Sequence, residues 1–255
     1  MFLLINVRLV LGIMKAFLKD KKEVAEKTLW FRYKLEKAVD FKPGQIFFIT
    51  IPKLKYKDDT GNTRHFSIVN SPSENNFIEM ATRMTGSGFK ETLKELPIGS
   101  EVEIGSISGE FTLPEEMKRS LVFIAGGIGI TPFMSMLRFI KEEVLPYKVI
   151  LFFSNKNRQT APFLEELEKI SNENIYFKFI PAMTEDKEWT GETGRIDEEM
   201  LRKHLTDLNS YSYFIAGPPL FNQAVREILE KVQVEKDNMK VENFSGYTTM
   251  YGIKD

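Results

Sequence analysis

The chain has 255 residues, a formal net charge of −1 at pH 7 and no cysteine. This length allows two modest domains with a core in each, and the balanced charge gives no basic excess for nucleic acid or an anionic membrane surface. Because cysteine is absent and only two histidines are present, we expect no disulfide, no thiol nucleophile and no metal site.

The first fourteen residues form an apolar run that is too short to span a membrane and is interrupted by Arg8. The run lacks the basic leading region and small-residue cleavage site of a signal peptide. We therefore predict that Met14 is the natural start, that residues 1–13 are an upstream extension, and that no membrane span is present. The absence of disulfides fits a reducing cytoplasm, which is the expected location.

Residues 14–117 have the pattern of a β domain. Short apolar runs alternate with turn signals such as Lys42-Pro-Gly44 and Pro97-Ile-Gly99, which favours a small antiparallel barrel of the Greek-key type. One helix, Phe89–Leu96, interrupts it. The predicted strands are Met14–Leu18, Glu23–Leu35, Gln45–Ile51, Arg64–Val69, Phe77–Arg83, Glu101–Ile104 and Glu110–Leu113.

Residues 118–255 change to an alternation of apolar strands and helical patterns. Such alternation predicts an open, five-stranded parallel sheet in an α/β domain, with ligands at the carboxyl ends of its strands. The predicted strands are Leu121–Ala125, Val149–Phe153, Ile175–Ile180, Tyr211–Ala216 and Lys240–Asn243. The predicted helices are Phe133–Val144, Pro162–Ile170, Asp197–Leu205 and Pro219–Val232.

A glycine-rich turn joins the first of these strands to a helix. Gly126, Gly127 and Gly129 follow the apolar strand and precede Thr131 at the predicted helix start. Free backbone N–H groups and the helix dipole favour an anion there, such as a pyrophosphate. The spacing is not that of the common dinucleotide fingerprint, so the motif alone also fits an ordinary tight turn.

Two further motifs lie in the β domain. Alternation places Arg64 and Phe66 on one strand face and Ser67 on the other, so that a phosphate, a flat ring and a ring nitrogen could be bound there. A surface arginine beside a core phenylalanine is the alternative. The second motif, Gly86-Ser87-Gly88, opens the interrupting helix, where Ser87 fits an N-cap. It offers a second pyrophosphate cradle, or an ordinary capped helix.

Together the motifs resemble those of the ferredoxin–NADP reductase-like superfamily, whose members are flavoproteins with an FAD-binding barrel followed by a nicotinamide-nucleotide domain. The likeness covers residues 14–247 in the right order. Four segments carry it: Arg64-His-Phe-Ser67, Gly126-Gly-Ile-Gly-Ile-Thr-Pro132, Ala216-Gly-Pro-Pro219 and Glu242-Asn-Phe-Ser-Gly-Tyr247. The resemblance implies FAD as cofactor and NAD(P)H as cosubstrate, with an FAD-binding domain at 14–117 and a nucleotide-binding domain at 118–255.

The resemblance also implies roles for single residues. Arg64 would pair with the flavin phosphate, Phe66 would stack on the isoalloxazine, and Ser67 would hydrogen-bond near its N5. The expected binding sets are Gly86, Ser87 and Gly88 for the FAD pyrophosphate; Gly126, Gly127, Gly129 and Thr131 for the dinucleotide; Gly217 and Pro218 for the nicotinamide pocket; and Phe244 as a shield for the flavin ring. Ser67 and Thr131 are the expected catalytic residues, in a reaction governed mainly by positioning.

Three residues depart from the family pattern. Phe66 replaces the commoner tyrosine, and Ala216 replaces the usual cysteine beside the nicotinamide. Thr184 follows the third strand of the second domain, where plant-type enzymes present Ser-Arg to the 2′-phosphate of NADP. Lys156 and Arg158 could replace that cation or could be solvated loop charges, and NADH is the favoured nucleotide.

The leading hypothesis is electron delivery from NAD(P)H through FAD to a separate carrier protein such as a ferredoxin or flavodoxin. This chain has no cysteine to hold an iron–sulfur cluster, so the carrier is expected on another molecule. Reduction of small acceptors, such as free flavin, ferric chelates or quinones, is a second enzymatic reading. A non-catalytic flavin-binding sensor is a third, and the presence of Ser67 and Thr131 weighs against it.

Overall fold

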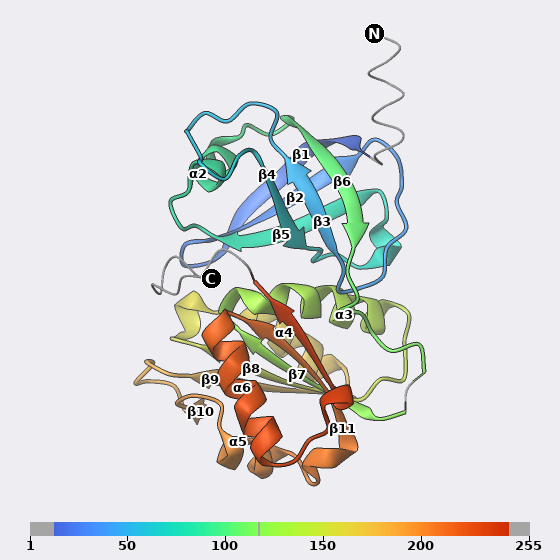
Figure 1. Ribbon diagram of the computed structural model, residues 1–255, viewed down its shortest axis with the longest axis vertical. Helices are drawn as coiled ribbons and strands as arrows, with labels where there is room; N and C mark the ends of the chain where they lie inside the picture. Colours follow the sequence, from blue (N-terminus) through green and yellow to red (C-terminus); the bar gives the residue numbers. More distant parts are fainter. Residues whose placement is uncertain (1–12, 117, 245–255) are drawn as a thin grey trace. The chain divides into compact units, whose positions relative to one another are not determined.

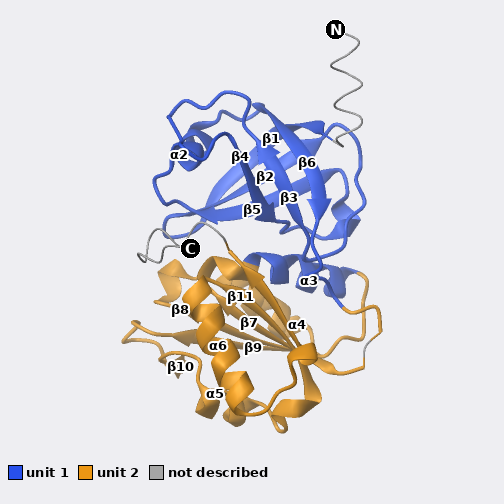
Figure 2. Ribbon diagram, in the orientation of Figure 1, with its two compact units in different colours: residues 1–113, 131–142 blue, residues 114–130, 143–255 orange. Residues whose placement is uncertain are grey.

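A computed structural model describes residues 13–116 and 118–244, so the predicted extension lies, apart from Ile13, outside the described residues. Contacts divide the chain into two compact units (Figure 2). The first contains residues up to 113 together with 131–142, and the second contains 114–130 and the residues from 143 onward. The domain boundary between 117 and 118 stays a prediction.

The first unit is built on an antiparallel sheet of six strands in the order β4-β3-β6-β1-β2-β5 (Figure 1). The end strands β4 and β5 also contact each other, which closes the sheet toward a barrel. Its interior is filled by buried aromatic and branched side chains, among them Phe31, Tyr33 and Phe47. The strands are β1 (Met14–Ala25), β2 (Thr28–Leu35), β3 (Ile46–Thr50), β4 (Thr63–Ser67), β5 (Phe77–Arg83) and β6 (Glu101–Ser108).

The predicted antiparallel barrel is confirmed, but two of its predicted strands were wrong. The run Glu23–Leu35 is not one strand, because a tight turn after Ala25 folds it into the β1–β2 hairpin. Lys27 takes a φ of 55° there, a conformation usually left to glycine, so no composition signal marks the turn. Residues Glu110–Leu113 form no strand in the described chain.

Within its described residues, the first unit contains two α-helices. The helix α2 (Gly88–Glu95) buries Phe89 and Leu93 in the barrel core. The second helix, α3 (Thr131–Glu142), follows the glycine turn in sequence yet has its contacts in the first unit. Its Ser135 hydroxyl donates to the backbone carbonyl of Asn70 at 2.7 Å.

The second unit is built on a parallel sheet in the order β10-β9-β8-β7-β11-β12. The α/β architecture is confirmed; the sheet has a sixth strand because the two-residue β10 pairs parallel to β9. The strands are β7 (Ser120–Gly126), β8 (Val149–Asn155), β9 (Phe177–Met183), β10 (Glu192–Thr193), β11 (Tyr211–Gly217) and β12 (Met239–Asn243). The strand order reverses between β7 and β11, and ligands of such sheets bind at the carboxyl ends beside that reversal.

In the described part of the second unit, three α-helices follow strands of the sheet. They are α4 (Leu164–Glu173), α5 (Glu198–His204) and α6 (Pro219–Lys231). Helices α5 and α6 bury Leu201, Val225 and Leu229 in one core with residues of β7, β8, β9 and β11. Across residues 13–116 and 118–244, none of the helices combines the length and the apolar character that a membrane crossing requires.

Candidate functional site

Arg64 and Phe66 share one face of β4, as the alternation predicts. Both lie against Phe89, the second residue of α2: the Arg64 guanidinium carbon is 5.0 Å from the ring centroid, and the two phenylalanine centroids are 6.3 Å apart. A cation and a half-buried aromatic ring are therefore presented side by side next to the start of α2. Local alternation and one long-range contact together position this pair.

The guanidinium of Arg64 is held by the loop that precedes β4. Its Nη2 donates to Asp58 Oδ1 at 2.6 Å, and its Nη1 donates to the carbonyls of Thr60, Gly61 and Thr63 at 3.0, 3.1 and 2.7 Å. These contacts fix the orientation of the side chain. A bidentate phosphate contact through the same nitrogens would have to replace these hydrogen bonds. The pairing with the flavin phosphate that is predicted for Arg64 would therefore rely on the positive charge of a guanidinium held in this orientation.

Asp58 connects this arginine to the start of α2, and no sequence motif distinguishes it from the other residues of its turn. Its carboxylate is 5% exposed and accepts a hydrogen bond from the Phe89 backbone N–H at 2.8 Å. Burial by itself raises the pKa of Asp58. The hydrogen bonds from Phe89 and Thr60 and the charge of Arg64 outweigh burial, and they hold that pKa far below its usual range.

The predicted cradle at residues 86–88 begins α2. Ser87 is the N-cap, because its hydroxyl accepts from the Lys90 backbone N–H at 3.3 Å. Gly86 has a φ of +80° and open space beside it. Gly88 is required by the chain itself, since a Cβ there would lie 2.1 Å from the Lys57 carbonyl oxygen. The space beside Gly86 is thus open to a ligand at the helix end, whereas Gly88 lets the start of α2 pack closely against the backbone of Lys57.

Lys90 adds a positive charge to the same helix end. Its ammonium donates to the Arg83 carbonyl at 2.8 Å, and burial together with repulsion from Arg64 and Arg83 lowers the pKa of Lys90 to about 8. Three cations thus gather at a helix N-terminus where Asp58 contacts Arg64. This donor set fits a diphosphate group. The place of Lys90 three residues after the N-cap is the sequence signal that could have identified it.

The two expected catalytic residues are both buried polar side chains of the first unit. Ser67 ends β4 and Thr131 begins α3. Ser67 is 4% exposed and Thr131 is 1% exposed, and few other polar side chains in the described chain are as buried. Their catalytic roles stay predictions.

In the second unit, the glycine turn lies at the carboxyl ends of β7 and β11. Gly126 ends β7, and Gly127 and Gly129 lie in the short 3-10 turn Gly127–Ile130. A Cβ on Gly129 would lie 2.1 Å from the Ala216 carbonyl oxygen, so glycine is required for the turn to pack on the end of β11. The turn is held at the strand-order reversal, where a dinucleotide is expected.

Phe221, in the first turn of α6, lies over both strand ends. A Cβ on Gly126 would come within 2.9 Å of its ring, and one on Gly217 within 2.6 Å. The two predicted ligand glycines therefore make room for this ring, and Pro218 caps the helix that carries it. The aromatic ring at the switch point was missed in the sequence because its position fits the apolar face of an amphipathic helix.

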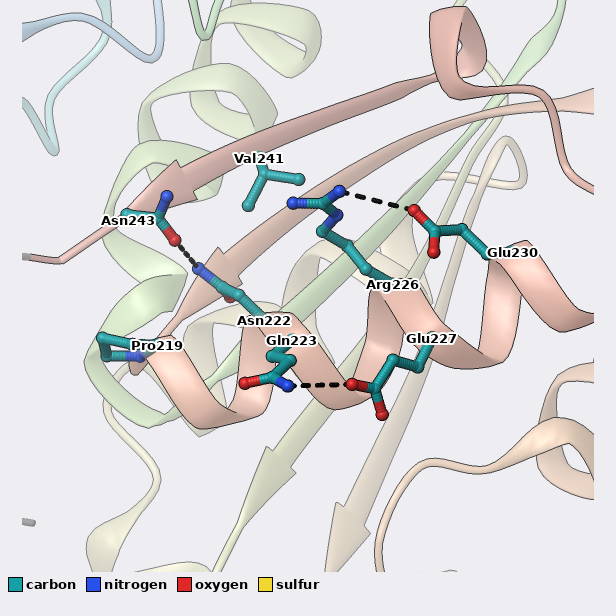
Figure 3. A pocket seen from close by; sticks show the side chains of 8 residues that line it. All are labelled: Pro219, Asn222, Gln223, Arg226, Glu227, Glu230, Val241 and Asn243. Atoms are coloured by element: carbon teal, nitrogen blue, oxygen red, sulfur yellow. Dashed lines mark hydrogen bonds and ion pairs between the residues drawn. The ribbon is translucent and has the colours of Figure 1, made fainter. Parts of the chain in front are cut away.

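The described part of the C-terminal motif is tied to α6. The buried Asn222 amide donates to the Glu242 carbonyl at 2.8 Å and to Asn243 Oδ1 at 3.0 Å (Figure 3). These bonds hold the two residues before the half-buried Phe244, whereas residues 245–247 of the motif lie outside the described residues. Burial raises the pKa of the Glu242 carboxyl. A hollow of about 260 Å³ lies beside Asn222, with Arg226 paired to Glu230 at its wall.

Comparison with known proteins gives the two units their family. Residues 15–113 match the family model of the oxidoreductase FAD-binding domain, and residues 123–227 match that of the oxidoreductase NAD-binding domain. The chain belongs to the ferredoxin–NADP reductase-like superfamily. FAD and a nicotinamide nucleotide are the cofactors of this superfamily's two domains, and the predicted anion cradle at α2 and the glycine turn after β7 lie within the residues that the two models match.

Two solved structures share this superfamily fold. The Amycolatopsis cytochrome P450 reductase matches with a TM-score of 0.79 at 20% identity, covering 91% of this chain and 69% of that one. A ferredoxin NADP+ reductase from Neisseria gonorrhoeae with bound FAD and NADP matches with a TM-score of 0.75 at 20% identity, covering 91% and 98%. At these identities the likeness shows the fold.

Curated relatives are longer than this chain. The phenol hydroxylase P5 protein of Acinetobacter pittii is 26% identical over 81% of this chain and 58% of its own length. The anthranilate 1,2-dioxygenase electron transfer component of Acinetobacter baylyi is 28% identical over 82% of this chain and 59% of its own length. The chain thus spans less than two thirds of these superfamily members.

Proposed function

We propose that this chain is a flavoprotein oxidoreductase that moves a hydride between NAD(P)H and FAD and passes electrons to a separate carrier protein such as a ferredoxin or flavodoxin. The observation that carries the proposal is the cationic end of α2, where Arg64, Arg83 and Lys90 gather beside Phe66. That arrangement suits a cofactor with a diphosphate and a flat ring. FAD, when bound, would supply a hydride acceptor that can release its electrons onward.

The residues of the chain would bind and orient rather than transfer protons. Arg64 and Lys90, with the N-terminus of α2, would hold the FAD diphosphate, and Phe66 would pack against the flavin ring. Ser67 would donate a hydrogen bond near the flavin N5. The turn from Gly126 to Gly129, together with Gly217, would receive the dinucleotide. Burial of Ser67, Gly126, Gly129 and Gly217 keeps water away from these groups and strengthens their polar contacts.

A protein acceptor is supported by the relatives. The Acinetobacter baylyi protein is named an electron transfer component of a dioxygenase, which describes delivery to another protein. We extend that delivery to this chain by similarity. Free flavin, ferric chelates and quinones are the competing acceptors, and a non-catalytic flavoprotein is the competing class.

Anaerobic stopped-flow mixing of the FAD-loaded protein with NADH or NADPH tests the proposal. We expect loss of the oxidised flavin absorbance within seconds, followed by reoxidation when purified ferredoxin or flavodoxin is added. Equal, slow reoxidation by carrier proteins and ferric chelate would contradict the protein acceptor. A flavin that stays oxidised for minutes with both nucleotides would contradict the oxidoreductase itself.

The affinity for FAD is expected to fall as the pH rises above about 8, the pKa of Lys90 in the cofactor-free chain. A diphosphate binds the protonated lysine better than the neutral one, so bound FAD raises this pKa. At pH values between the pKa of Lys90 in the free chain and its higher pKa in the complex, FAD binding takes up a proton. In that range the dissociation constant for FAD grows by up to about tenfold per pH unit. Titrations that follow the quenching of FAD fluorescence between pH 6.5 and 9.5 measure this dissociation constant at each pH.

The variant Lys90→Met removes the titrating group while keeping an unbranched side chain. Its FAD affinity should be weaker at pH 7 and flat through this range, while Lys94→Met, an exposed change on the same helix, should keep the wild-type slope. A slope in Lys90→Met as steep as in the wild type would assign the pH dependence to another group.

A further inference from the structure

The loop after β8 lies where the adenosine end of a dinucleotide is recognised in this type of sheet. In doubly wound sheets, the segment after the second strand reads the 2′ position of the adenosine ribose: a carboxylate there accepts the free hydroxyl, and an arginine there accepts a 2′-phosphate. In chain order β8 is the second strand of this sheet. Lys156 and Arg158 follow it directly, so the charge around these two cations bears on the choice between NADH and NADPH.

A buried amide at the end of β8 points to a polar ligand at this edge. Asn155 is 6% exposed, and neither Oδ1 nor Nδ2 of its side chain has a hydrogen-bond partner among residues 13–116 and 118–244. A buried amide left unpaired costs free energy, so its retention here calls for a partner that the described part of the chain does not supply. A ribose hydroxyl can both donate to and accept from such an amide.

Both cations after β8 are already paired with carboxylates from the loop after β9, residues 185–188, which we name the acidic loop. Arg158 Nε donates to Asp186 Oδ2 at 2.8 Å, and its Nη2 lies 3.3 Å from Asp186 Oδ1 and 3.2 Å from Glu188 Oε2. Lys156 Nζ lies 3.4 Å from Glu185 Oε1. The two cations after β8 thus face three carboxylates of the acidic loop, which also carries the exposed Lys187.

The backbone fixes this arrangement. The Thr184 N–H donates to the Asn155 carbonyl at 2.9 Å, and the Glu185 N–H donates to the Lys156 carbonyl at 2.7 Å. Asp186 also accepts from the backbone N–H of Arg158 and of Glu188, at 3.4 and 3.2 Å. The acidic loop is therefore tied to the end of β8 by main-chain bonds as well as by ion pairs.

We propose that the acidic loop makes this chain select NADH over NADPH, an inference that rests on the proposed function, in which a nicotinamide nucleotide reduces FAD. An unmodified ribose brings no charge and leaves the pairs of Lys156 and Arg158 intact. A 2′-phosphate would have to displace Asp186 from Arg158 or Glu185 from Lys156 and would then lie beside the displaced carboxylate, because charged acceptors compete for the same donors.

Two measurements on the FAD-loaded protein test the selectivity. Anaerobic stopped-flow compares flavin reduction by NADH and NADPH, and calorimetry compares binding of 5′-AMP with that of adenosine 2′,5′-bisphosphate, which differ only in the 2′-phosphate. We expect NADH and 5′-AMP to be favoured by about 10- to 100-fold, the range of a hydrogen bond to a charged group.

The variant Glu185→Arg places a cation beside Lys156 and leaves the bidentate Arg158–Asp186 pair in place. It should raise the affinity for adenosine 2′,5′-bisphosphate about tenfold or more while leaving that for 5′-AMP unchanged. The matched control is Glu227→Arg, the same charge change on α6, where Glu227 accepts from Gln223. The control should leave the ratio of the two affinities as in the wild type.

The possible results distinguish a failure of the NADH selectivity from a failure of the proposed oxidoreductase function. Equal reduction by NADH and NADPH would overturn the selectivity and leave the oxidoreductase standing. An unchanged affinity ratio in Glu185→Arg would overturn the role of the acidic loop. Reduction by neither nucleotide would overturn the proposed function instead.

Discussion

Replacing Glu79 by glutamine is expected to lower the free energy of unfolding by about 3 kcal/mol, because it removes the buried negative charge that two half-buried arginines share. Glu79 is 2% exposed on β5. Its carboxylate accepts from Arg32 Nη1 at 2.6 Å, from Arg138 Nη1 at 2.8 Å and from Trp30 Nε1 at 3.1 Å. One charge therefore connects two barrel strands with helix α3.

Thermal unfolding of the FAD-loaded protein measures the effect, and a midpoint lower by roughly 6–12 °C is expected for a chain of this size. The matched control is Glu101→Gln, which breaks the ion pair with Lys15 at 2.9 Å, where the two side chains are 39% and 41% exposed. Exposed pairs contribute about 0–1 kcal/mol, so its midpoint should move little. Equal shifts in the two variants would show that burial does not set the cost.

The sequence could not reveal this cluster, although it predicted the strand that carries Glu79 with the right bounds. A glutamate in an alternating strand reads as a solvent-facing residue. Its partners Arg32 and Arg138 are 47 and 59 positions away in sequence, and only the folded chain brings them to the same carboxylate. Strand periodicity is a local property, whereas charge burial depends on long-range pairing.

The candidate site likewise contains features that follow from neighbouring residues and one that depends on a contact between distant residues. The shared face of Arg64 and Phe66 follows from a two-residue period, and the cap at Ser87 follows from one helical turn, so both could be predicted from neighbouring residues. Asp58 joins Arg64 and Phe89 through a loop contact that no period encodes. Sequence reasoning therefore found the elements of the site and missed the residue that connects them.

The glycines show a further limit of sequence reasoning. Gly88, Gly126 and Gly217 were assigned to ligand contact, since glycine permits close approach. In the structure the space of their missing side chains is taken by the chain itself, by the Lys57 carbonyl at Gly88 and by the Phe221 ring at the other two. A glycine pattern signals close packing, and the sequence alone does not say what is packed.

Replacing Gly129 by alanine is expected to destabilise the protein by about 3 kcal/mol, at the upper end of overpacking costs. The added Cβ would lie 2.1 Å from the Ala216 carbonyl oxygen and 2.8 Å from the Gly217 Cα. Both are backbone atoms of β11, which pairs with β7 and β12 and cannot yield as a flexible side chain would. Either the glycine turn or the end of β11 must shift.

Because that shift occurs at the strand-order reversal, nucleotide binding should be lost together with stability. Calorimetry with NAD+ on the FAD-loaded variant, below its unfolding temperature, is expected to show at least about tenfold weaker binding. The control Gly105→Ala adds a methyl group in β6 at 3.2 Å from the Phe48 Cβ, a contact that a small adjustment relieves. If Gly129→Ala matched this control in midpoint and in NAD+ affinity, the turn would not be the rigid part of the nucleotide site that its packing implies.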